Sequence, residues 1–115
     1  MPRDVRKICF DILKAIGELQ DFTKDKKFAD YRNSRMLQMA VERGFEIIGE
    51  ALRRMSVEFP VEFSSISDGR KIIDFRNILT HGYDVISDEI VWNAIENNLD
   101  ILKIEIENIS SKANE

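Results

Sequence analysis

The stretch DYRNSRMLQMAVERGFEIIGEALRRMSVE, residues 30–58, decides the fold of this chain. Apolar residues recur in it at intervals of three and four, the spacing of one helical face: Leu37, Val41, Phe45, Ile48, Leu52 and Met55. A second apolar stripe flanks the first and contains Met36, Met39, Ala40, Ile47 and Ala51. We predict one long helix over 30–58, whose apolar face is wider than contact with a single neighbour requires.

Two interpretations fit this wide face. The helix is either the centre of a bundle and touches two neighbours, or it also contacts a second copy of the chain. Gly44 and Gly49 lie in its interior, where a glycine costs about 1 kcal/mol relative to alanine. Close approach of another backbone would explain both glycines, and it favours a dimer contact through this helix.

Three further helices are indicated before and after this one. Apolar stripes predict helices over about 4–20, 69–81 and 88–109, with Pro60, Gly82 and Ser87 as end and start signals. The connections are short, so neighbouring helices should run antiparallel. The 115 residues contain no repeat or linker and indicate a single domain over 1–115. We expect an all-α, antiparallel four-helix bundle with room for short extra helical turns in the connectors.

The charge is unevenly distributed along the chain. Basic residues number 17 and acidic residues 21, a net charge of −4 that argues against a globally basic nucleic-acid-binding protein. Residues 1–83 contain 15 basic and 13 acidic residues, a net of +2, whereas residues 84–115 contain 2 and 8, a net of −6. The acidity is therefore concentrated near the last helix, and a local phosphate site elsewhere is electrostatically feasible.

One cysteine, Cys9, and one histidine, His81, restrict the chemistry further. No disulfide can form within the chain, and one Cys with one His cannot build a Cys/His metal site, so we expect no metal and no cofactor. Cys9 lies in an apolar helical pattern and is expected to be a core residue rather than a nucleophile. The charged start, and the lack of an apolar run of about 18 residues, indicate no targeting or membrane segment. We expect a cytoplasmic protein.

The stretch DFRNILTHGY, residues 74–83, is the candidate site. Arg76 offers a planar, permanently charged fork that suits phosphate. His81 can exchange a proton near neutral pH, and Tyr83 adds a hydroxyl group just beyond the helix. Asn77 precedes His81 by four residues, on the same helical face, and could orient the imidazole ring.

The spacing of Arg76 and His81 leaves alternatives open. Five residues correspond to about 500° of helical rotation, so the two side chains do not share one face of an ideal helix. They converge if the helix loosens near Thr80, if the arginine reaches round the helix, or across a two-fold dimer. In a purely structural interpretation, His81 caps the helix C-terminus, and Arg76 forms a surface ion pair with Asp74 or a glutamate.

The chain resembles a known family at this motif. Arg76-x4-His81-x-Tyr83 matches the Arg-x4-His-x-Tyr motif of the HEPN superfamily, and the surroundings match its HepT-like branch of small toxins. Three further segments of that branch are present in the same order: Glu-Ile-Ile-Gly-Glu-Ala at 46–51, Arg-Asn at 76–77 and Ile-Val-Trp at 90–92. The resemblance covers nearly the whole chain.

The resemblance implies a function and partners. Such proteins are metal-independent ribonucleases that act as toxins, with Arg76 and His81 as the implied catalytic residues and Asn77 and Tyr83 in support. The implied partner is a nucleotidyltransferase antitoxin of the MntA type, which transfers AMP to the motif tyrosine, here Tyr83. The implied active site lies in the cleft of a homodimer, and the implied substrate is RNA, such as tRNA or mRNA.

The chemistry of RNA cleavage suits these residues. The 2′-hydroxyl can attack the adjacent phosphate without a metal, given proton transfer and stabilisation of the developing charge. His81 would transfer the proton and Arg76 would bind the phosphate, while a two-fold dimer would supply the second histidine of an acid–base pair. The alternative function is a non-catalytic helical module that binds a nucleotide or a partner nucleotidyltransferase through Arg76 and Tyr83.

Other candidate residues have more ordinary interpretations. Glu42, Glu46 and Glu50 could bind a metal, but arginines at 43, 53 and 54 favour a solvated face of ion pairs. Tyr31 and Trp92 could stack on bases, although packing at an edge of the bundle or dimer is the favoured interpretation. Arg70 and Lys71 either extend a phosphate track or form an exposed helix start.

Overall fold

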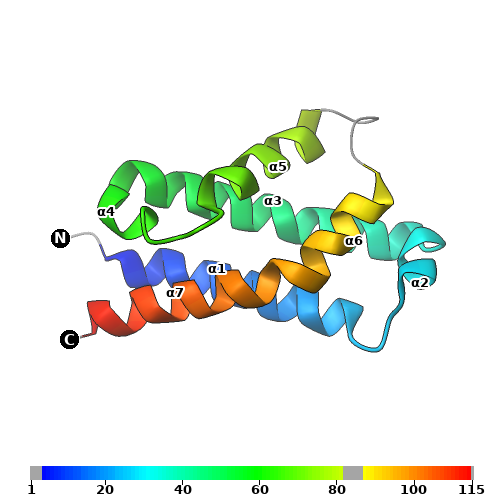
Figure 1. Cartoon of the computed structure of the whole chain (residues 1–115), viewed down its shortest axis with the longest axis horizontal. Helices are drawn as coiled ribbons and strands as arrows, with labels where there is room; N and C mark the ends of the chain where they lie inside the picture. The colour runs from blue at the N-terminus through cyan, green and yellow to red at the C-terminus, as the bar shows by residue number, and fades with distance from the viewer. Residues whose placement is uncertain (1–3, 82–86, 115) are drawn as a thin grey trace.

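The computed structural model describes residues 4–81 and 87–114 of the chain. Within these ranges the chain forms helices and no strands (Figure 1): α1 (Val5–Thr23), α2 (Phe28–Arg32), α3 (Arg35–Glu58), α4 (Pro60–Phe63), α5 (Gly69–His81), α6 (Asp88–Asn97) and α7 (Leu99–Ala113). The all-α prediction is confirmed. The short α2 and α4 are extra helical turns of the kind expected between the longer helices.

The predicted helix over 30–58 is in fact two helices. Ser34 has an extended backbone, and its hydroxyl oxygen accepts a hydrogen bond from the Leu37 N–H at 3.1 Å. This side-chain cap starts α3 at Arg35 and separates it from α2. The predicted start at residue 30 is therefore too early, because the apolar stripes begin only at Met36 and Leu37, after the Ser34 cap.

The predicted last helix is likewise divided, at Asn98. The Asn98 N–H still bonds the carbonyl oxygen of Ala94, and its own carbonyl accepts from Leu102, so the chain bends without losing its backbone bonds. The Asn98 side chain reaches Asp68 at 3.5 Å, away from the helix axis. Figure 1 shows α6 tilted against α7 at this point.

The core lies between α1, α3 and α7, with α5 packed along α3 (Figure 1). Its centre is made of aliphatic side chains with at most 2 % exposure, among them Ile12, Ile16, Ile48, Leu52, Leu102 and Ile106. Cys9 is fully buried in this core, as predicted, and burial raises the pKa of its thiol to about 11. No helix of the described residues is long and apolar enough to cross a membrane.

Tyr31 on α2 and Trp92 on α6 pack against each other. Their ring centroids are 5.6 Å apart, and the two residues are only 1 % and 7 % exposed. Neither ring presents a free face for a nucleic-acid base. The packing interpretation of these two residues is therefore confirmed.

The two glycines of α3 permit close contacts within one chain. A Cβ added to Gly44 would lie 2.5 Å from Cδ2 of Leu19 on α1, and one added to Gly49 would lie 2.6 Å from Cγ of Arg76 on α5. The approaching groups are side chains of the same chain, not another backbone. Contacts within one chain therefore account for both glycines, and a dimer contact through this helix stays a prediction.

Candidate functional site

Helix α5 carries the candidate site and is fixed to α3 by aromatic and aliphatic contacts. The rings of Phe75 and Phe45 meet edge to face with centroids 5.1 Å apart, and Ile73 is 3 % exposed. These contacts set the rotation of α5 about its axis. As a result, Arg76 faces α3, and its side chain starts directly over Gly49.

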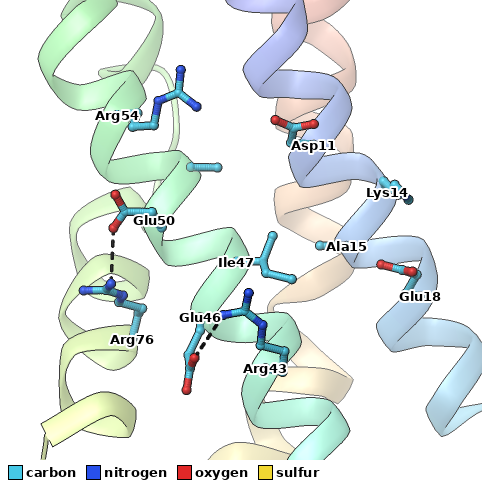
Figure 2. Close-up of a pocket in the computed structure, with 11 residues that line it drawn as sticks. Asp11, Lys14, Ala15, Glu18, Arg43, Glu46, Ile47, Glu50, Arg54 and Arg76 are labelled. Carbon is cyan, nitrogen blue, oxygen red and sulfur yellow. Dashed lines mark hydrogen bonds and ion pairs between the residues drawn. The ribbon is translucent and has the colours of Figure 1, made fainter.

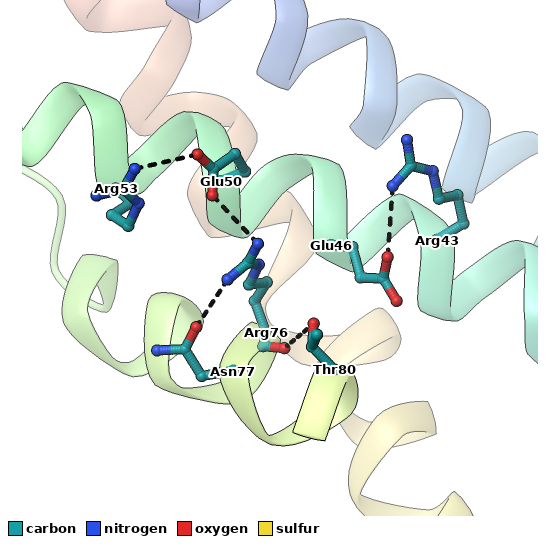
Figure 3. Close-up of polar contacts among 7 residues, drawn as sticks. All are labelled: Arg43, Glu46, Glu50, Arg53, Arg76, Asn77 and Thr80. Atoms are coloured by element: carbon teal, nitrogen blue, oxygen red, sulfur yellow. Dashed lines mark hydrogen bonds and ion pairs between the residues drawn. The ribbon is translucent and has the colours of Figure 1, made fainter. Parts of the chain in front are cut away.

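The guanidinium group of Arg76 is held by two neighbours (Figure 3). Its Nη2 lies 3.2 Å from Oε2 of Glu50 on α3, and its Nη1 donates to Oδ1 of Asn77 at 2.9 Å. The Arg76 side chain is 26 % exposed, and its Nε is buried without a hydrogen-bond partner in the described part of the chain. Arg76 is therefore a partly buried cation whose orientation is constrained by both α3 and α5.

The ion-pair interpretation of Arg76 is confirmed in its glutamate form. The partner is Glu50, across the helix contact, rather than the neighbouring Asp74. The arginine side chain is 26 % exposed and that of Glu50 is 42 % exposed. Sequence reasoning allowed a glutamate partner but did not identify Glu50. The Gly49-Glu50 pair in the 46–51 segment could have indicated it, because a glycine lets a side chain of another helix approach closely and the next residue carries a charge.

The other residues of the motif are placed less completely. The side-chain oxygen Oδ1 of Asn77 accepts a hydrogen bond from Arg76, and the expected orientation of the His81 imidazole by Asn77 stays a prediction. Helix α5 continues through Thr80 to His81, so loosening at Thr80 does not bring Arg76 and His81 together. The His81 side chain and Tyr83 lie outside the described residues. Convergence of Arg76 with these two groups therefore remains a prediction.

A cleft of about 410 Å³ opens beside Arg76, between α1 and α3 (Figure 2). Its charged lining consists of four acidic residues (Asp11, Glu18, Glu46, Glu50) and four basic residues (Lys14, Arg43, Arg54, Arg76). The formal charges of this lining cancel. Attraction for an anion therefore depends on how individual groups are held, not on a net positive field.

The glutamates of α3 form ion pairs, as predicted for a solvated face. The pairs span 3.3–3.5 Å and are Glu42–Arg35, Glu46–Arg43, Glu50–Arg53 and Glu58–Arg54. No three His, Cys, Asp or Glu side chains of the described residues are grouped so that they could hold a metal ion.

Arg70 and Lys71 form an exposed helix start. The Arg70 guanidinium lies 5.4 Å from the ring centroid of Phe63, and the Lys71 side chain is 87 % exposed and 4.0 Å from Asp68. Both side chains make these contacts near the beginning of α5, about two turns before Arg76. Of the two interpretations offered for them, the structure favours the exposed helix start over a phosphate track.

Comparisons with known proteins agree with one another. A family model described as Ribonuclease HepT-like matches residues 12–109. The chain is 33 % identical over 105 residues to the Methanocaldococcus jannaschii protein named "Putative RNase MJ1380", covering 91 % of this chain and 95 % of that one. It is 28 % identical over 109 residues to "Probable ribonuclease HepT" of Thermococcus cleftensis, covering 95 % and 98 %. No solved structure matches the chain significantly.

Proposed function

The chain belongs to the HepT-like ribonuclease family, and from this premise we propose that it is a ribonuclease that acts as the toxin of a toxin–antitoxin pair. The family match over residues 12–109 is the observation that carries the proposal, because it includes α3, α5 and the whole candidate site. The names of the relatives from M. jannaschii and T. cleftensis support the same activity.

In the proposed reaction the RNA is cleaved without a metal ion. The 2′-hydroxyl of one nucleotide attacks the adjacent phosphorus, its proton passes to a base, and the 5′-oxygen of the next nucleotide leaves with a proton from an acid. His81 carries out proton transfer. Arg76 binds the phosphate and stabilises the negative charge that develops on the phosphate oxygens. A guanidinium group whose orientation is constrained is better suited to this role than one that moves freely.

The proposed active form is a homodimer. Each chain has one histidine, whereas attack and departure of the two oxygens require a base and an acid. A second copy of the chain supplies the second His81 across a two-fold axis. Asn77 supports the reaction through its bond to Arg76.

Control of the toxin is proposed to act on Tyr83. A cognate nucleotidyltransferase antitoxin transfers AMP to the Tyr83 hydroxyl. The added phosphate brings negative charge and bulk next to the site, where it competes with the phosphate of RNA.

A cleavage assay tests the ribonuclease proposal. Purified wild-type protein, shown by intact mass to be unmodified, is incubated with total tRNA and with mRNA in an excess of chelator. We expect cleavage by the wild type and a loss of at least about 100-fold in Arg76→Ala and His81→Ala. Arg70→Ala removes an arginine from the same helix and should cleave normally. Equal cleavage by wild type and His81→Ala, or none by the unmodified wild type, would exclude the proposed reaction.

A further inference from the structure

We propose that Glu50 is a positioning residue, which holds the Arg76 guanidinium in the orientation that receives the RNA phosphate. This inference rests on the proposed function, because it assigns Glu50 a part in the same reaction. It is carried by three features of the described residues: the contact of Arg76 with Gly49, the two anchors on its η nitrogens, and the second arginine bound to Glu50.

The backbone of α3 comes close to Arg76 only because residue 49 is a glycine. Any larger residue there would meet Cβ and Cγ of Arg76. The aliphatic part of the arginine therefore lies against the helix, and its guanidinium group emerges beside the next residue along, Glu50. This placement brings Nη2 to 3.2 Å from the carboxylate.

The buried Nε of Arg76 indicates that other contacts must hold this side chain in place. An N–H group that is buried without an acceptor disfavours the conformation that buries it. Other contacts must therefore maintain the conformation, and within the described residues the polar contacts of the Arg76 side chain are those with Glu50 and Asn77. Of these two residues, Glu50 carries the opposite charge and lies on α3, whereas Asn77 lies on α5 like Arg76 itself (Figure 3). Glu50 therefore determines where the guanidinium group lies relative to the cleft.

The anchored guanidinium still has donors for a phosphate. Each η nitrogen of arginine carries two N–H groups. Asn77 accepts a hydrogen bond from one of those on Nη1, whereas Glu50 faces Nη2 as an ion pair. At least one N–H on each η nitrogen is therefore left to donate to the oxygens of a phosphate. The phosphate can therefore bind without displacing Glu50.

Glu50 does not cancel the attraction for phosphate because it is shared. Its Oε1 accepts a bond from Nη2 of Arg53 at 3.3 Å, while its Oε2 faces Arg76. The group of one carboxylate and two guanidiniums has a net charge of +1. Arg53 thus contacts the carboxylate on the side opposite Arg76, and Glu50 lies between two guanidinium groups.

Steady-state cleavage by Glu50→Gln tests the positioning role. Glutamine keeps the size of the side chain and removes the charge, and because Glu50 is 42 % exposed the fold should tolerate it. We expect kcat to fall about 10-fold to 100-fold with KM nearly unchanged, as for a displaced catalytic group. Glu42→Gln is the matched control, since Glu42 lies on the same helix and pairs with Arg35 but does not line the cleft. Unchanged kcat in Glu50→Gln, or a lower KM, would overturn the proposal, the latter by showing that Glu50 competes with RNA.

A double variant shows whether Glu50 acts through Arg76. In an Arg76→Ala background, Glu50→Gln should cause no further loss of the residual cleavage. A further loss equal to that in the wild-type background would assign Glu50 an independent role and contradict positioning.

A second measurement separates this inference from the proposed function. The side-chain guanidinium signals of Arg76 are observed by ¹⁵N NMR without RNA and assigned with Arg76→Lys. We expect restricted rotation of the group in the wild type and in Glu42→Gln, and free rotation in Glu50→Gln. If the protein shows this pattern but cleaves no RNA, the proposed ribonuclease function is refuted and the anchoring of Arg76 by Glu50 is retained. The same Arg76 signals in wild type and Glu50→Gln would refute the anchor, whatever the activity.

Discussion

Gly49 on α3 lies directly under the side chain of Arg76 on α5, so closely that a Cβ on residue 49 would come within 2.6 Å of the arginine Cγ. This contact joins the 46–51 segment to the 74–83 segment, which are far apart in the sequence. It also explains a glycine in the middle of a 24-residue helix, where alanine would be preferred on helix propensity alone.

The first prediction concerns Gly49→Ala. Alanine gains about 1 kcal/mol of helix propensity, but the added methyl group pushes Arg76 away, and overpacking costs about 1–3 kcal/mol. We expect a net loss of about 1 kcal/mol in the free energy of unfolding, measured by urea denaturation, together with a fall in RNA cleavage. A variant that is more stable than the wild type and fully active would show that this contact does not constrain Arg76.

The matching prediction concerns Gly17→Ala on α1. A Cβ at this exposed position would meet no atom within 4 Å, so only the propensity gain remains. We expect a gain of about 1 kcal/mol in the free energy of unfolding and unchanged cleavage. The opposite signs expected for the two glycines make the pair informative, because both substitutions are chemically identical. Destabilisation by Gly17→Ala would contradict the open surroundings of this residue.

The sequence was sufficient for the helix faces but not for every break between helices. Apolar periodicity placed Ile12, Ile48 and Leu102 in the core because each lies on a stripe that only burial explains. The break at Asn98 is not apparent in the sequence, since the apolar spacing of Ile95, Leu99 and Leu102 continues through it. The break at Ser34 precedes the apolar stripes and could have been predicted from its capping side chain. At Ser34 a side-chain cap begins α3, and at Asn98 the side chain contacts Asp68 on another part of the chain.

In the candidate site, too, one feature could be predicted from the sequence and another could not. Arg76 could be singled out by its chemistry and by its place in a family motif, both of which are local properties of the sequence. Its contact with Glu50 depends on how α5 is rotated against α3, which is decided by the packing of Phe75 on Phe45. No spacing rule within one helix contains that information, because the two residues lie on different helices.

A third prediction follows from the burial of Cys9. Burial raises the pKa of its thiol from 9.0 to about 11, so the folded state favours the protonated form. Between about pH 9 and pH 11 the unfolded chain therefore binds fewer protons than the folded one, and stability falls as pH rises through this window. We expect urea denaturation to show a steeper loss of stability from pH 9 to pH 11 in the wild type than in Cys9→Ala. The same slope in both proteins would show that the thiol does not contribute.

The last prediction concerns the two tyrosines of the chain, Tyr31 and Tyr83. Tyr31 is 1 % exposed, and burial raises the pKa of its hydroxyl, so in the folded protein it is neither accessible nor a ready nucleophile. Coexpression with the cognate nucleotidyltransferase should therefore add the mass of AMP to the wild type and to Tyr31→Phe, but not to Tyr83→Phe. Intact-mass spectrometry measures the three proteins directly. AMP on Tyr83→Phe would place the modification on another residue and separate the control of this protein from its Arg-x4-His-x-Tyr motif.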